Sequence, residues 1–343
     1  MTATSSKQRR KRKRGGGGGA PPSVPAQAVD DGRCNPASPS FDWPSRGIRP
    51  FRSRFDIEER IAYGSYKEVF LAQDKGTGND VALCIYVESV AESERFLQRH
   101  LQTMYAVRHP AVMRVVDGGI ALDGEGKPHA YVTADLIRQS VTAGHAVLQA
   151  GGALMTPRVL RYCHDVLAGL QAFHNSGLVH GSPHGNNTLI DADGAAVLVD
   201  FDWTMPVGET RIRANELVTI VGFNQTTPEQ LRGLPHDERS DLYVAGLGMF
   251  HVACGRLPYS DTTYGTMDGV DGLRFIDRLD RLPATPRSIN PNLPEQLSDL
   301  LLSLLTPNPA NRPHSAAAAL TELKRIAFPF PGREASIAVR KDT

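Results

Sequence analysis

The chain has few cysteines, few aromatic residues and almost no net charge. Its 343 residues include four cysteines, 7% aromatic residues and a formal net charge of +1. The cysteines are Cys34, Cys84, Cys163 and Cys254, which lie far apart in the sequence. This spacing fits neither a disulfide framework nor a zinc knuckle, so a reducing compartment is the simplest environment for the protein.

Long apolar runs are also absent. The longest nearly apolar segment is Tyr243 to Cys254, well below the ~18 residues that indicate a membrane-spanning helix. The chain has 41% apolar and 22% charged residues, which excludes a collagen-like or a fully disordered protein. The sequence therefore predicts a soluble protein with one large or two ordinary globular domains.

The near-zero net charge hides a strongly basic segment. Residues 7–14 hold seven Lys and Arg and no acid, which leaves 31 Lys and Arg against 37 Asp and Glu elsewhere. Five glycines, Gly15–Gly19, and a stretch rich in Gly, Pro and Ser follow. Such a composition cannot bury enough apolar surface to offset its ordering entropy, so we expect residues 1–50 to be disordered.

The basic run allows several interpretations. It fits a contact with importin, nucleic acid or an anionic membrane, and it fits a solvated tail without a partner equally well. The tail lacks the apolar segment of a secretory signal. A cytoplasmic or nuclear location is therefore expected, without secretion through a signal peptide.

Apolar periodicity divides the rest of the chain into two parts. Alternating residues predict strands near 57–61, 69–71 and 81–85, then a helix over 96–105 and strands at 111–117 and 129–136. The second part is predicted to be mainly helical. Its expected elements are a helix capped by Thr156, opened by Pro157 and ended by Gly177, short strands at 188–191 and 196–200, and helices at 241–255 and 295–305. A β-rich lobe followed by a helical lobe predicts a cleft between them.

Short motifs follow one another in a fixed order along these two parts. They are I-A-Y-G-S-Y-K-E-V-F (Ile61–Phe70), V-A-L-C (Val81–Cys84), H-G-S-P-H-G-N-N-T-L-I (His180–Ile190), D-F-D (Asp200–Asp202), T-P-E (Thr227–Glu229), D-x-x-x-x-G (Asp241–Gly246) and N-R-P (Asn311–Pro313). This order resembles the eukaryotic-type protein kinase family over residues 55–328. The resemblance implies an α+β, bilobal fold with a small β-rich N-lobe at 51–136, a helical C-lobe at 137–329 and a tail at 330–343.

The resemblance assigns structural roles to several residues. It implies an ion pair between Glu229 and Arg312 that braces the C-lobe. It also places Met104, His180, Phe201 and Asp241 in the family's regulatory hydrophobic column.

The adenine of a nucleotide would lie in a slot that the resemblance also defines. The walls of this slot are expected from Val69, Ala82 and Leu189. Thr133 would be its gatekeeper, and the backbone of Ala134 to Leu136 its hinge. The glycine-rich turn keeps Gly64 but has Ala62 and Lys67 at the other two glycine positions, so its backbone is expected to approach phosphate less closely.

Several residues that perform phosphoryl transfer in the family are replaced in this sequence. Ser182 replaces the catalytic aspartate, and a serine is not a general base near neutral pH without help. Gly181 replaces the arginine that reads a phosphorylated activation loop. Cys84 replaces the phosphate-binding lysine, and His100 falls at the position of that lysine's glutamate partner. Lys67 has the spacing seen in the with-no-lysine kinases, so the resemblance predicts that it is the phosphate clamp, whereas a solvated strand lysine is the alternative.

Metal-binding capacity is expected to survive. Asn187 and Asp200 match the two Mg²⁺-ligand positions, and both offer the hard oxygen atoms that Mg²⁺ prefers. Asp202 adds a carboxylate in place of the family's glycine. His180 and His184 are four residues apart but lack a third ligand, so neither zinc nor haem is expected; the cofactors would be ATP or ADP with Mg²⁺.

Three hypotheses about function follow. The first is a nucleotide-binding pseudokinase that acts as a regulatory or scaffold module through an unknown protein partner. The second is a weakly active serine/threonine kinase that uses Lys67 as clamp and in which Ser182, His184 and Asn187 line the catalytic loop. The third is a non-enzymatic interaction protein with a basic targeting tail. The motif around His180 also resembles aminoglycoside and choline phosphotransferases, and D-F-D resembles lipopolysaccharide kinases, but Ser182 weakens both of those readings because these relatives use the same aspartate.

Overall fold

The structure is a computed structural model, and it describes residues 53–64, 67–87, 90–122, 127–209, 227–232, 234–259 and 281–326. The predictions for the tail 1–50, the basic run 7–14 and the C-terminal segment 330–343 fall outside these residues. None of the helices in the described ranges combines the length and the apolar character needed to cross a bilayer.

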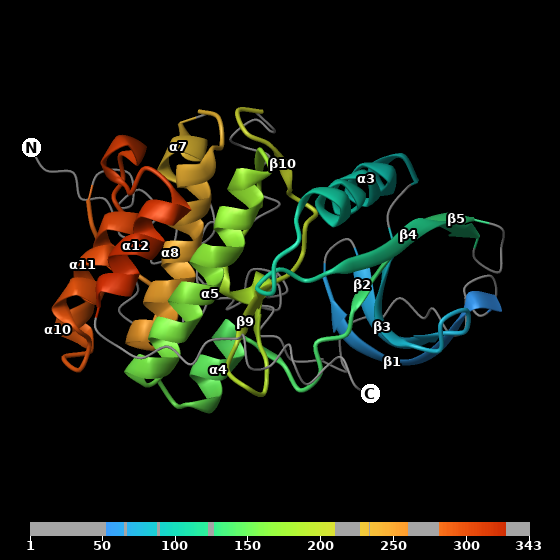
Figure 1. Ribbon diagram of the computed structural model, residues 1–343, viewed down its shortest axis with the longest axis horizontal. Coiled ribbons are helices and arrows are strands. Elements are labelled where there is room, and N and C mark those ends of the chain that lie inside the picture. Colours follow the sequence, from blue (N-terminus) through green and yellow to red (C-terminus); the bar gives the residue numbers. More distant parts are fainter. Residues whose placement is uncertain are drawn as a thin grey trace, which may run out of the picture.

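The N-lobe is an antiparallel sheet with one helix. Strands β1 (Phe55–Tyr63), β2 (Lys67–Asp74), β3 (Asp80–Tyr86), β4 (Val115–Leu122) and β5 (Pro128–Asp135) form a sheet in the order β1-β2-β3-β5-β4. Helix α3 (Val90–Ala106) packs against β4 and β5 (Figure 1). The alternation of apolar residues therefore located the first three strands and β5 correctly.

One strand was predicted too early in the chain. The sequence suggested residues 111–117, but β4 spans Val115–Leu122 and includes Gly118 and Gly119. A pair of glycines argues against a strand when only propensity is considered. Here Gly118 serves packing instead, because a Cβ atom at this position would lie 2.7 Å from Leu97 Cδ1 of α3.

The C-lobe is built around two buried helices. Helix α5 (Thr156–Asn175) packs against α8 (Glu238–Cys254) and α12 (Ala316–Arg325), and α11 (Glu295–Leu304) packs against α8 and α12. The remaining helical elements are α4 (Ala143–Gln149), α7 (Pro228–Leu231), α10 (Pro286–Ile289) and the 3₁₀ turns η1 (Gly185–Asn187) and η3 (Pro309–Asn311). Figure 1 shows these helices on the far side of the molecule from the five-stranded sheet.

The ends of α5 differ in part from the prediction. Met155, with no side-chain hydrogen bond to the helix, is the N-cap residue, and Thr156 is already helical, so the predicted cap at Thr156 is wrong. Pro157 lies in the first turn as expected, since its missing N–H has no intrahelical partner there. Gly177 follows the C-cap with φ +70°, the left-handed conformation that commonly ends a helix.

Short strands on the C-lobe carry the site residues. The hairpin of β8 (Thr188–Ile190) and β9 (Ala196–Leu198) pairs with β6 (Val141–Thr142), and β7 (Leu178–Val179) pairs with β10 (Met205–Pro206). Leu198 exchanges backbone hydrogen bonds with Ala111 and Met113, which follow α3. These bonds hold the end of β9, and the D-F-D segment after it, against the segment that joins α3 to β4.

Candidate functional site

Lys67 lies at the centre of the site. It is the first residue of β2 and pairs with Tyr86 of β3 across the sheet, whereas Cys84 pairs with Val69. The Nζ atom of Lys67 lies 2.8 Å from Asp200 Oδ1 and 2.9 Å from Asp202 Oδ2. The lysine of β2 therefore reaches the carboxylates that follow β9, and the alternative of a solvated strand lysine does not describe its environment.

The electrostatics of this cluster favour its charged form. Burial opposes the charge of Lys67, but Asp200 and Asp202 outweigh it and hold the pKa of the ammonium above its ordinary value. Burial likewise opposes the charge of Asp200, yet Lys67 lowers the pKa of that carboxyl well below its usual range. Burial raises the pKa of the Cys84 thiol to about 11. Cys84 is therefore an uncharged, buried thiol beside the ammonium.

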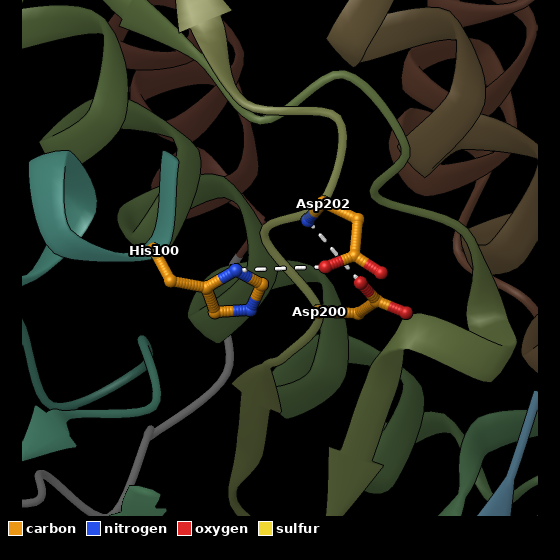
Figure 2. Close-up of side chains that lie close together, drawn as sticks. All are labelled: His100, Asp200 and Asp202. Carbon is orange, nitrogen blue, oxygen red and sulfur yellow. Dashed lines mark hydrogen bonds and ion pairs between the residues drawn. The ribbon is translucent and has the colours of Figure 1, made fainter. Parts of the chain in front are cut away.

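Asp202 connects the D-F-D segment to helix α3 and to β3. Its Oδ1 accepts a hydrogen bond of 2.6 Å from the Tyr86 hydroxyl and lies 3.5 Å from Nδ1 of His100. The guanidinium of Arg99 donates to the Asp202 carbonyl. Figure 2 shows the ring of His100 directed at the two carboxylates. The glycine position of the family thus holds a carboxylate that joins three elements.

His100 has a defined orientation in this network. Its Nε2 atom accepts a hydrogen bond of 3.4 Å from the backbone N–H of Phe201, and its Nδ1 atom faces Asp202. The side chain is buried, at 1% exposure. At the position of the family's helix glutamate, α3 therefore presents an imidazole whose Nδ1 atom is directed at the Asp202 carboxylate.

An aromatic column crosses the site. Phe201 packs against His100, Phe173 and His180 with ring-centroid distances of 5.6, 5.6 and 5.7 Å. Burial lowers the pKa of His180, which keeps its ring neutral within the column. The column links α3 to α5 and to the catalytic loop, as the resemblance implies for His180 and Phe201.

Asp241 of α8 fixes the backbone of the catalytic loop. Its carboxylate accepts the N–H groups of His180 at 2.7 Å and Gly181 at 2.9 Å. Its oxygens also lie 3.1 Å from Nε2 of His174 and 3.0 Å from Nε2 of His236. Burial alone would raise the pKa of Asp241, but these partners hold it far below the ordinary value. Asp241 thereby anchors the backbone of the loop at His180 and Gly181.

A hydrogen-bonded chain extends from Asp241 to the T-P-E motif. Gln230 is fixed at the start of α7, because its Oε1 atom accepts from the Thr227 N–H at 2.9 Å. The amide group of Gln230 then faces Nδ1 of His236 at 2.7 Å. This arrangement places the proton of His236 on Nε2, toward Asp241. The end of the T-P-E segment and the catalytic loop are thus connected through two side chains and the Asp241 carboxylate.

The catalytic loop has no charged base at the expected position. Ser182 is 2% exposed, and its backbone carbonyl accepts from Asn187 Nδ2 at 3.1 Å and His184 N at 2.9 Å. Burial lowers the pKa of His184 to about 4, and its Nδ1 accepts from the Asn186 N–H. His184 is therefore a weak proton acceptor, well below the basicity that suits general-base catalysis near neutral pH.

The donors around Asp200 fit a divalent cation. The backbone carbonyl of Asn187 accepts from Val199 N at 2.9 Å, so Asn187 lies across the hairpin end from the residue before Asp200. A nitrogen of His100 and oxygens of Asp200 and Asp202 lie within 4.8 Å of one another. Carboxylate and amide oxygens are the ligands that Mg²⁺ prefers, and the Lys67 ammonium already lies between the two carboxylates. Asp200, Asn187 and Asp202 would hold Mg²⁺, which neutralises phosphate charge when bound.

The side chains expected around adenine lie along the N-lobe sheet and the β8 strand. Val69 and Leu189 are half-buried, and Ala82 is 8% exposed. Thr133 is fully buried and donates to the Asp117 carbonyl at 3.3 Å, while Ala134 pairs with Ala82. Before this slot, Ala62 and Gly64 are exposed, and Gly64 N donates to the Lys67 carbonyl at 2.8 Å. Leu136, at the end of the hinge, also lines a separate cavity of about 890 Å³ together with Arg108, Met113 and Asp193.

The brace of the C-lobe is present. Arg312 donates to both oxygens of Glu229, at 2.7 and 2.8 Å, and Ser240 Oγ donates to the same carboxylate at 2.6 Å. The guanidinium also lies 4.6 Å from the centre of the Tyr243 ring. This bidentate, buried pair connects α7, α8 and η3, as the two motif positions predicted.

Several site residues were missed from the sequence. The contacts of Tyr86 and Arg99 with Asp202, and of His174 and His236 with Asp241, join residues that lie between 5 and 116 positions apart. Trp203 is a further case, because its carbonyl oxygen lies 2.2 Å from the place where a Cβ atom at position 181 would be. Among these contacts, that of His236 with Asp241 joins residues only five positions apart, so it is the one that a local sequence pattern could have indicated.

Comparison with known proteins gives this geometry a family. The sequence model of the protein kinase domain matches residues 55–323. The chain belongs to this family. Similar curated proteins of this kinase family include the serine/threonine-protein kinase PknB of Mycobacterium tuberculosis, at 26% identity over 80% of this chain and 43% of the relative. Another is the DNA damage-responsive serine/threonine-protein kinase RqkA of Deinococcus radiodurans, at 30% identity over 77% of this chain and 38% of the relative. A third is the serine/threonine-protein kinase PksC of Streptomyces coelicolor, at 28% identity over 83% of this chain and 51% of the relative.

This kinase domain thus spans about half, or less, of the length of those relatives. Its matched segment begins at β1 and ends within α12. It has the sheet-and-helix N-lobe and the helical C-lobe that the resemblance implied, so the α+β fold class is confirmed.

Proposed function

We propose that this kinase domain is a nucleotide-binding pseudokinase that acts as a regulatory or scaffold module. The observation that carries the proposal is the combination of a complete charge cluster, Lys67 with Asp200 and Asp202, and a catalytic loop whose base position is the buried Ser182. Positioning and charge neutralisation are retained, whereas the group that accepts the substrate's proton is lost.

The binding role follows from the same cluster. Lys67 supplies the ammonium that Cys84 cannot supply, and its side chain is only 12% exposed. Lys67 of the N-lobe and Asp200 of the C-lobe would hold ATP or ADP with Mg²⁺. Because the nucleotide would touch both lobes, it would favour one arrangement of the lobes, and an unidentified protein partner would bind that arrangement.

A weakly active serine/threonine kinase is the second candidate. The 2.8 Å contact between Lys67 Nζ and Asp200 Oδ1 favours it, because charge stabilisation contributes more to phosphoryl transfer than the base does. Loss of a positioned base lowers the rate by about 10²–10⁴. The third hypothesis, a pure interaction protein, rests on residues 7–14, which lie outside the described residues.

Two measurements separate the candidates. For the pseudokinase, ATP with Mg²⁺ raises the melting temperature of the wild type, while transfer of radiolabelled phosphate to generic substrates stays at the level of the Asp200→Ala variant. Ser182→Asp serves as the positive control, since it returns a carboxylate to the base position. Transfer by the wild type that is lost in both Asp200→Ala and Lys67→Met would establish the kinase instead. No thermal stabilisation by ATP would eliminate nucleotide binding.

A further inference from the structure

The cavity beside Leu136 has no role in the site described above. Its volume of about 890 Å³ lies in the range of ligand-binding pockets. Among the described residues, its lining includes Leu136 but none of the three side chains expected to wall the adenine slot. The lining comes from the α3–β4 connection, the residues after β5, helix α5 and the turn between β8 and β9. We call it the hinge cavity; a ligand in it would contact both lobes.

The lining of the hinge cavity combines apolar and charged side chains. Val112 and Val197 are buried and Met113 is half-buried, so they offer apolar surface. Three of the four arginines of the lining already contact a carboxylate: Arg114, Arg138 and Arg161 do so at Asp135, Asp80 and Asp165. The exposed side chains of Arg108 and Asp193 form no ion pair within the described part of the chain. The cavity therefore suits a ligand with apolar groups and one charge of each sign.

A segment of this composition occurs in the N-terminal part of the chain. Phe41 and Trp43 are the only aromatic residues among residues 1–50; Asp42 lies between them and Arg46 follows. Pro44 favours an extended backbone at Trp43, and alternate residues of an extended chain point to the same side. The sequence thus predicts that Phe41 and Trp43 share one face. These residues lie outside the described ranges.

The described chain begins close enough to the hinge cavity for this segment to reach it. Arg54 lies 2.6 Å from Asp117 of β4, and Asp117 follows Arg114 of the lining by three residues, or roughly 10 Å. The 11 residues from Trp43 to Arg54 span up to roughly 36–40 Å when extended. The length of the connection therefore does not limit the contact.

We propose that residues 41–46 of the same chain occupy the hinge cavity. Phe41 and Trp43 pack against its apolar side chains, since aromatic residues gain most from burial. Asp42 pairs with Arg108, and Arg46 pairs with Asp193. The contact attaches the N-terminal segment to both lobes. It goes beyond the proposed nucleotide binding and does not depend on it.

The test measures how accessible Trp43 is to solvent. Trp43 and Trp203 are the only tryptophans, so the full chain with Trp203→Phe reports on Trp43 alone in acrylamide quenching of fluorescence. Because a pocket buries ~70–90% of its ligand's surface, we expect quenching to be at least about threefold slower in the folded chain than in concentrated urea. In the chain with both tryptophans, 5-fluorotryptophan labelling gives a separate ¹⁹F signal for Trp43, assigned by Trp43→Phe, and allows the same comparison.

Variants of the cavity show whether Trp43 lies there. Met113→Asp places a charge in the apolar part, and Arg108→Glu reverses an exposed charge without touching the core. Both should bring quenching towards the rate in urea. Arg158→Glu is the matched control, because Arg158 is an exposed arginine of α5 outside the lining, and it should leave quenching unchanged. Asp42→Arg combined with Arg108→Glu restores opposite charges and should restore slow quenching.

Three results would overturn the proposal. Quenching as fast in the folded chain as in urea means that Trp43 is not buried. Slow quenching that persists in every folded cavity variant places Trp43 elsewhere on the protein. Protection that is lost on dilution assigns the contact to the segment of a second copy. If the charge exchange between positions 42 and 108 fails to restore protection, the pairing of Asp42 with Arg108 is wrong.

Discussion

Gly181 holds a backbone conformation that a side chain would disturb. Its φ is +85°, and a Cβ atom would lie 2.2 Å from the Trp203 carbonyl oxygen. Its N–H donates to Asp241 at the same time. The position therefore lacks both the family's arginine and the space for a side chain, because the backbone of Trp203 lies where a Cβ atom would be.

This geometry predicts the effect of Gly181→Ala. The left-handed conformation costs an alanine about 1–2 kcal/mol, and displacement of the Trp203 backbone adds to this, so we expect a loss of about 2–4 kcal/mol in the free energy of unfolding. Gly208→Ala is the matched control, because Gly208 has the same φ of +85° but nothing within 4 Å of its Cβ position. Urea denaturation measures both. Equal losses in the two variants would show that Trp203 yields without cost.

The sequence was sufficient to place single residues that belong to motifs. Lys67, Asp200 and Asn187 lie where motif order predicted them, because strand pairing and a short hairpin fix their backbone positions. The partners of these residues could not be predicted in the same way. The contact of Asp202 with Tyr86 joins residues 116 positions apart, and it depends on how α3 and the sheet pack, which no local pattern encodes.

At the scale of secondary-structure elements, one ion pair joins three of them. Glu229 belongs to α7, Ser240 to α8, and Arg312 follows η3. Burial opposes the charge of Glu229, but Arg312 and Ser240 hold the pKa of this carboxyl below its ordinary value. The pair therefore adds stability above the unfolded-state pKa of about 4.3. This contribution is lost as the pH falls through the lower pKa of the folded state.

Arg312→Met is expected to destabilise the fold strongly. Glu229 would remain as an unpaired buried carboxylate, which typically costs about 3–5 kcal/mol at pH 7. The difference from the wild type should shrink as the pH falls through the lowered pKa of Glu229 in the folded wild type, because this carboxyl is then protonated in both proteins. Chemical denaturation at several pH values measures this.

A matched control for this variant is available on the surface. Arg287 lies 3.4 Å from Glu295, and both side chains are largely exposed. Arg287→Met should change the free energy of unfolding by about 0–1 kcal/mol. A loss of the same small size in Arg312→Met would mean that Glu229 reaches water or another partner in the variant.

Helix assignments show where sequence patterns are weakest. The core of α8 was predicted from its apolar run, but its start was not, because Asp237 caps the helix and Glu238 to Ser240 form a polar first turn. Thr156 has the chemistry of a cap, yet the chain turns one residue earlier, at Met155. A capping residue is specified by the path of the chain into the helix, and that path is set by tertiary contacts.

At the scale of the whole molecule, charge is divided between two parts of the chain. Residues 7–14 carry seven positive charges, and the rest of the chain carries six more acids than bases. This division makes the tail the part suited to a polyanion, and nucleic acid is one of its expected partners. The partner itself remains a prediction, since these residues lie outside the described ranges.

Salt dependence tests the tail directly. If its seven basic residues contact phosphates of duplex DNA, log K should fall against log[salt] with a slope of up to about −6. Deletion of residues 1–14 should remove most of this slope and of the binding, which fluorescence anisotropy measures. A chain with the seven Lys and Arg changed to Gln is the control for length. An unchanged slope in both would assign the contact to the kinase domain.

The relocated pair of Lys67 and Asp202 also constrains how this sequence can vary. A neutral residue in place of Lys67 leaves two carboxylates together, of which that of Asp202 is buried, while a neutral residue at position 202 removes one of the two carboxylates that contact the ammonium. Residues in one charge network show interaction energies of about 0.5–3 kcal/mol. The effect of a substitution at one position therefore depends on the other, and this epistasis leaves few single-step routes back to the arrangement with a lysine at position 84.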